Sequence, residues 1–112
     1  MDTQRRKEAT VAWKSRRPNM GVFAVRCEAT GDTFVGTSPD TDRAMNGVRA
    51  RLDTGMHRNK SLQALWDEHG ADAFSYEVVE LLEYDEPSDD YADDLAALLA
   101  LVAERFPEAQ RL

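Results

Sequence analysis

The feature that most constrains the fold is a pair of short apolar runs separated by a polar turn that contains a glycine. The first run, residues 20–27, holds four consecutive apolar side chains from Val22 to Val25, which is typical of a strand buried on both faces. The second run covers residues 33–37, and residues 29–32 between them centre on Gly31. A short glycine-containing loop favours a tight turn, so the sequence predicts a β-hairpin.

Two helical patterns follow the hairpin. In residues 41–53, Ala44, Val48 and Leu52 recur at i, i+4 and i+8, which places them on one stripe of a helix. Asp40 or Thr41 is expected to cap this helix, and Gly55 to end it. Residues 61–69 predict a second helix that Asn59 or Ser61 begins and that Gly70 ends.

The remaining elements lie at the two ends of the chain. Residues 74–82 alternate apolar and polar side chains and predict a third strand, and residues 91–105 predict a Leu/Ala-rich helix. Residues 4–15 suit a short N-terminal helix. The order α-β-β-α-α-β-α predicts an α+β fold, with a small three-stranded antiparallel sheet flanked by helices. A chain of 112 residues supports one domain, residues 20–112, with residues 1–19 as an N-terminal helical extension.

Composition narrows the location and the partners. No run of 18 or more apolar residues exists, so we expect no membrane span. The first residues lack the apolar core of a secretory signal, and the single cysteine, Cys27, cannot form an internal disulfide, which favours a cytoplasmic location. Residues 1–60 carry 12 Lys/Arg against 7 Asp/Glu, whereas residues 61–112 carry 2 against 14. Only the first half would therefore attract a polyanion.

An ordered set of short motifs gives the chain a family resemblance. Gly21-Val22-Phe23 and Phe34-Val35-Gly36 stand one hairpin apart, and residues 55–66 read GMHRNKSLQALW before Gly70, Phe74 and residues 76–80. Over residues 21–80 this set resembles the GIY-YIG nuclease superfamily, in the form found in intron-type homing endonucleases and small bacterial relatives. The resemblance implies a domain that hydrolyses phosphodiester bonds in DNA with one divalent metal, Mg²⁺ or Mn²⁺.

The residues that the family uses for chemistry are mostly replaced. Both tripeptide tyrosines are phenylalanine, Phe23 and Phe34, and a phenyl ring has no hydroxyl to transfer a proton. The family's helix arginine and the histidine that follows it fall at Ala44 and Val48. The metal-binding glutamate falls at residues 98–100, which hold no carboxylate. If the terminal helix is aligned one turn differently, Asp94 or Glu104 becomes the alternative ligand; otherwise we expect no metal site and no cofactor.

A few polar residues of the motif remain. His57 is the one catalytic candidate left, as a general acid or phosphate contact, although it could equally bond to backbone; Asn59 could bind nucleic acid or cap the next helix. Basic residues cluster around the first helix and its loop, and with Asn59 they form the candidate nucleic-acid surface: Arg43, Arg49, Arg51, Asn59, Arg58 and Lys60. On that helix we expect Arg49 and Arg51 to lie on other faces than Ala44 and Val48.

Three functions from different classes fit these residues. The first is a catalytically impaired domain that binds DNA or another nucleic acid through the basic surface of the first helix. The second is a divergent metal-dependent endonuclease that uses His57. The third is a module that keeps only the fold and binds a protein through its acidic C-terminal half.

Overall fold

A four-stranded sheet forms the centre of the domain. The computed structural model of the protein describes residues 18–85 and 90–112, so the helix predicted at 4–15 lies outside the described residues. The strands are β1 (Gly21–Cys27), β2 (Thr33–Ser38), β3 (Phe74–Leu81) and β4 (Gln110–Arg111), in the order β3-β1-β2-β4. β1 pairs antiparallel with both β2 and β3, which makes it a central strand as the apolar run predicts.

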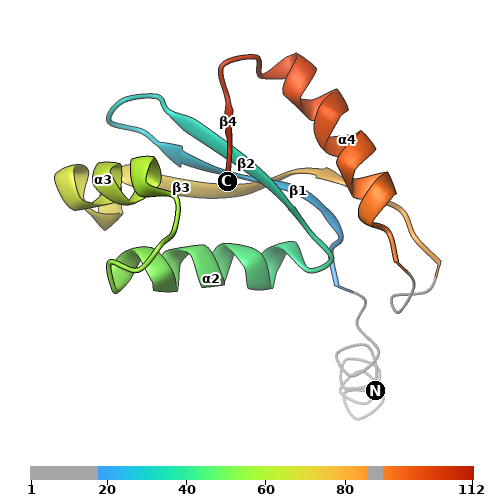
Figure 1. The fold of residues 1–112 in the computed structure, drawn as a ribbon, viewed down its shortest axis with the longest axis horizontal. Coiled ribbons are helices and arrows are strands. Elements are labelled where there is room, and N and C mark those ends of the chain that lie inside the picture. The colour runs from blue at the N-terminus through green and yellow to red at the C-terminus, as the bar shows by residue number, and fades with distance from the viewer. Residues whose placement is uncertain (1–17, 86–89) are drawn as a thin grey trace, which may run out of the picture.

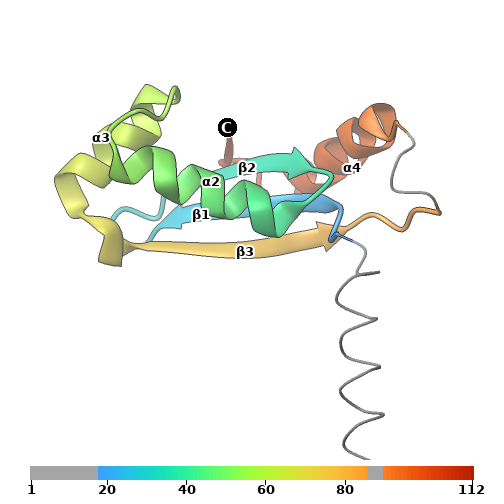
Figure 2. The ribbon, with the colours of Figure 1, turned by 90° about the horizontal axis from the view of Figure 1, so that it is seen from below.

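Helices cover both faces of the sheet (Figures 1 and 2). The helices α2 (Thr41–Asp53) and α3 (Lys60–His69), with the short 3-10 helix η1 (Ala71–Ala73), lie on one side, and α4 (Ala92–Arg105) lies on the other. Within the described residues each helix is too short or too polar to cross a lipid bilayer. The α+β class and the element order from the first strand to the terminal helix are confirmed.

The side chains of β1 alternate between two hydrophobic clusters. Phe23 and Val25 pack with Phe34, Val48 and Leu62 under α2 and α3, whereas Val22 and Ala24 pack with Val35 and Val102 under α4. The apolar run is continuous because both faces of β1 are buried, and each side chain finds an apolar layer. All of these residues are almost completely excluded from solvent.

The predicted sheet has one strand too few. Residues 110–111 pair in parallel with residues 34–35 of β2, and the backbone N–H of Leu112 donates to the carbonyl of Val35 (N···O 2.9 Å). A strand of two exposed residues has no alternating pattern that a sequence could display. This pairing changes which residues share a surface. β4 covers the free edge of β2 at residues 34–35 and brings the last residues of the chain to the same side of the domain as α2.

The ends of α2 and α3 fix the loop between them. The side chain of Asp40 caps α2 by accepting from the backbone N–H of Arg43 (3.1 Å), and Asn59 caps α3 by accepting from Leu62 (3.1 Å). Both caps were among those expected from the sequence. Gly55 follows α2 with a φ of 76°, a backbone angle that favours glycine, and turns the chain into the loop of residues 54–59.

Candidate nucleic-acid interface

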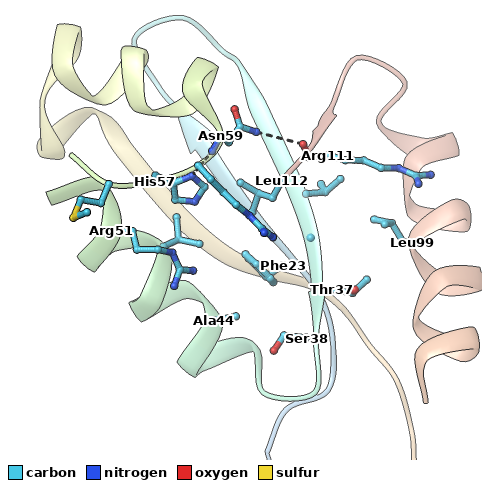
Figure 3. Close-up of a pocket in the computed structure, with 15 residues that line it drawn as sticks. Phe23, Thr37, Ser38, Ala44, Arg51, His57, Asn59, Leu99, Arg111 and Leu112 are labelled. Carbon is cyan, nitrogen blue, oxygen red and sulfur yellow. Dashed lines mark hydrogen bonds between the residues drawn. The ribbon is translucent and has the colours of Figure 1, made fainter. Parts of the chain in front are cut away.

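A groove opens between α2, β2, the loop 54–59, β4 and α4 (Figure 3). Its volume is about 850 Å³. We call it the arginine groove, because three of the residues that line it are arginines. The lining residues are Phe23, Val35, Gly36, Thr37, Ser38, Ala44, Val48, Arg51, Met56, His57, Arg58, Asn59, Leu99, Arg111 and Leu112.

The wall formed by α2 corrects one expectation from the sequence. Arg51 lines the arginine groove together with Ala44 and Val48, rather than lying on another face. Seven residues advance a helix by about 700°, so positions 44 and 51 differ by only about 20° around the axis. The guanidinium of Arg51 also extends back over Gly47, where an added Cβ would lie 3.4 Å from its nitrogen atoms. The charge of Arg51 therefore lies beside the preceding turn of α2, near Ala44 and Val48.

His57 is fixed in the loop by hydrogen bonds. Its backbone N–H donates to Oε1 of Gln63 (3.1 Å), and its Nδ1 accepts from the backbone N–H of Asn59 (3.0 Å). Gln63 is itself buried and donates through Nε2 to the carbonyl of Leu52 and to Asp67 (both 3.0 Å). Gln63 therefore links the end of α2 to the loop. The imidazole of His57 bonds to the backbone, which is one of the two roles that the sequence allowed.

Burial and two neighbouring arginines determine the charge of the His57 side chain. The side chain is only 5% exposed, and burial lowers its pKa from the ordinary 6.5, with smaller contributions from the charges of Arg51 and Arg58. Because Nδ1 accepts a hydrogen bond, the proton of the neutral ring is on Nε2. At neutral pH His57 is thus an uncharged donor at the edge of the arginine groove, between cationic neighbours.

The C-terminal residues form a side of the groove that sequence reasoning missed. Arg111 and Leu112 both line it, and the Asn59 side chain donates to the carbonyl of Arg111 (3.4 Å), which links the loop to β4. The methyl group of Leu112 lies over Gly36, 3.3 Å from where a Cβ would be. Arg111 carried no signal in the sequence, because it is 53 residues from Arg58 and belongs to no motif.

The floor and the far wall are apolar. Phe23 lines the floor and is 4% exposed, whereas Phe34 is completely buried in the core and does not line the groove. The terminal-helix segment 98–100 does reach the groove, through Leu99. The two alternative carboxylates on that helix, Asp94 and Glu104, are exposed and do not line it.

The charges in the arginine groove are uncompensated. Within residues 18–85 and 90–112, the guanidinium groups of Arg51, Arg58 and Arg111 form no ion pair, and no Asp or Glu lines the groove. The same part of the chain holds no group of three His, Cys, Asp or Glu residues that could bind a metal ion. Mg²⁺ and Mn²⁺ prefer carboxylate oxygens, so the lining residues do not fit the metal that the resemblance implies.

The basic cluster predicted from the sequence therefore divides. Arg51, Arg58 and Asn59 line the groove, but Arg43, Arg49 and Lys60 do not. The guanidinium of Arg49 lies over the ring of Tyr76, 5.0 Å from its centroid, on the side of α2 that faces β3. This contact explains the position of Arg49 by packing, because a cation is attracted to an aromatic face.

The arrangement of the strands and helices matches that of a domain whose structure is known. The structure is similar to that of the catalytic domain of the homing endonuclease I-TevI, with a TM-score of 0.68 and 17% sequence identity over 83% of this chain and 97% of that chain. A point mutant of the I-TevI catalytic domain matches with a TM-score of 0.66 and 17% identity, over 80% of this chain and 84% of that chain. No protein-family model matches the sequence, and no curated protein is significantly similar to it. The fold predicted from the motifs is confirmed.

Proposed function

We propose that this domain binds the phosphate backbone of nucleic acid in the arginine groove and does not hydrolyse it. One observation carries the proposal: three guanidinium groups line one groove that no carboxylate lines, and none of them forms an ion pair with another described residue. The chain has a net charge of −7. These guanidinium groups concentrate positive charge in a protein that is acidic as a whole. A bound polyanion is the natural source of the missing counter-charge.

Each polar group of the groove has a role that suits a phosphate. The guanidinium groups of Arg51, Arg58 and Arg111 supply positive charge and planar pairs of donors. His57 offers the N–H of its Nε2 as a neutral donor. Thr37 and Asn59 add a hydroxyl and an amide at the rim. None of these contacts reads a base, so binding should depend little on sequence.

The residues that would perform hydrolysis are missing from the same surface. Phe23 cannot transfer a proton, and Phe34 is enclosed in the core. Leu99 lines the groove from α4, in the segment where the resemblance to the GIY-YIG family places the metal-binding carboxylate. Groups that act together in catalysis are strongly interdependent, so the loss of several at once should abolish turnover.

A cytoplasmic location, where thiols such as the buried Cys27 stay reduced, belongs to the same proposal.

The experiment pairs a binding assay with a cleavage assay. Fluorescence anisotropy of labelled oligonucleotides should show binding that weakens steeply with salt and that is much weaker in the double variant Arg51→Ala/Arg58→Ala. Supercoiled plasmid incubated with excess protein and Mg²⁺ or Mn²⁺ should stay intact. Nicking that disappears in His57→Ala would contradict the proposal and support a divergent endonuclease.

A matched control separates groove charge from total charge. The variant Arg43→Ala/Arg49→Ala also removes two positive charges, both from positions on α2 that lie outside the groove. It should bind nearly as well as the wild type. If both double variants lose affinity equally, attraction to the whole helix explains the binding and the groove has no special role.

A further inference from the structure

Resting on the proposed function, we infer that the arginine groove takes a single strand of nucleic acid in preference to a duplex, and that the strand passes between Arg51 and Arg111. These two arginines belong to different walls. Figure 3 shows Arg51 on the α2 side and the side chain of Arg111 extending from β4 toward α4, with Phe23, Thr37 and Leu112 between them. A backbone lying over this floor would have positive charge on both sides.

The size of the groove limits what can enter it. Pockets of about 300–1,000 Å³ hold molecules of the size of roughly one or two nucleotides, and this groove has a volume of about 850 Å³. A duplex is too wide to enter a space of this size and would rest on the rims. A single strand can instead place successive phosphates inside, next to the guanidinium groups on opposite walls.

Outside the groove, α4 adds negative charge. α4 carries three carboxylates, from Asp93, Asp94 and Glu104, and one guanidinium, from Arg105. That guanidinium is already paired with Glu80 at 3.0 Å. These carboxylates do not line the groove, so a ligand that extends over α4 meets their negative charge and a strand held inside the groove does not.

The lining also indicates how the strand would be held. The only aromatic ring that lines the groove among the described residues is Phe23, and its side chain is too buried to stack on a base. Proteins that bind single strands by stacking expose aromatic faces. Here the contacts would go to phosphates, so DNA and RNA strands should both bind, and without strong sequence preference.

The test compares four ligands of one sequence: a 12-nucleotide DNA strand, the corresponding RNA strand, the DNA duplex and a 5′-mononucleotide. Anisotropy titrations, with competition for the mononucleotide, would be run at several salt concentrations. With one phosphate contact for each of the three arginines, inside the groove and where the strand enters and leaves it, log K should fall against log salt with a slope of about −2 for the single strands. The duplex and the mononucleotide should each bind at least about tenfold more weakly, since neither has several phosphates inside the groove.

Two single variants test the role of Arg111. Arg111→Ala should reduce the slope for single strands to about −1.4, because one phosphate contact is lost. Arg26→Ala removes the same charge from an exposed position on β1, outside the groove, and should leave the slope unchanged. Both side chains are exposed, so neither change threatens folding, and circular dichroism would verify this.

The outcomes separate this inference from the function on which it rests. A duplex that binds as tightly as the single strand, or an unchanged slope in Arg111→Ala, would overturn the single-strand inference and leave backbone binding in place. A mononucleotide that binds as tightly as the 12-nucleotide strands would show a terminal-phosphate pocket and would also overturn it. Failure of every ligand to bind would end both proposals.

Discussion

Replacing Gln63 with leucine tests how the loop of the arginine groove is held. Leucine has a similar size but leaves the buried backbone N–H of His57 without a partner, and the carbonyl of Leu52 keeps only the bond from the N–H of Gly55. An unsatisfied buried polar group costs about 1–3 kcal/mol. We therefore expect the free energy of unfolding to fall by about 1–3 kcal/mol, allowing for the apolar area that leucine gains.

The assay is urea unfolding followed by circular dichroism. The midpoint should fall while the slope with urea stays constant, because the surface exposed on unfolding is unchanged. In a thermal scan the loss corresponds to a decrease in Tm of about 5–15 °C for a domain of this size. Hydrogen exchange at the amides of His57 and Asn59 should also become faster, since the loop loses its link to α2.

Gln110 offers a matched control. Its side chain is exposed on β4 and forms no hydrogen bond in the described structure, so Gln110→Leu should change stability by less than about 0.5 kcal/mol. If Gln63→Leu is no more destabilising than Gln110→Leu, the reasoning about the buried glutamine is wrong. The loop would then be held by the cap at Asn59 alone.

Three further changes test other parts of the structure. Phe34→Tyr should lower stability by about 1–3 kcal/mol in thermal denaturation, because the new hydroxyl is buried in an apolar core; recovered nuclease activity would contradict the account of that position. Gly21→Ala should destabilise the sheet by about 1–3 kcal/mol in urea unfolding, because its Cβ would overlap the backbone carbonyl of Glu80. The lowered pKa of His57 means that the folded state binds its proton less readily than the unfolded state. The contribution of neutral His57 to the stability of the protein is therefore fully present above about pH 6.5 and declines as the pH falls through the lower folded-state pKa. His57→Gln should remove this part of the acid sensitivity between pH 7 and pH 5, and equal sensitivity in both proteins would refute it.

Local patterns determine most of the fold, and these are visible in the sequence. The run Val22 to Val25 indicates a strand covered on both faces, and Asp40 and Asn59 begin helices because their side chains satisfy free N–H groups. The strands and helices between residues 20 and 105 accordingly lie within one residue of their predicted bounds. β4 could not be predicted, because pairing to the edge of β2 depends on contacts distant in sequence.

The site was less predictable than the fold, for geometric reasons. Counting residues placed Arg51 on the same helix as Ala44 but not on the same face, although seven residues are nearly two full turns. Arg111 was invisible because only the folded chain brings it beside the loop 54–59. Conversely, Arg49 is basic and close in sequence, but its contact with Tyr76 directs it away from the groove.

The most direct test of the central claim is the salt dependence of binding in Arg51→Ala/Arg58→Ala. If the groove neutralises about three phosphates of a single strand, the wild type should show a slope of about −2 and the double variant about −0.7. The protein would be titrated against one labelled oligonucleotide at several salt concentrations. Equal slopes for both proteins, or no binding at low salt, would contradict the claim that the arginine groove binds nucleic acid.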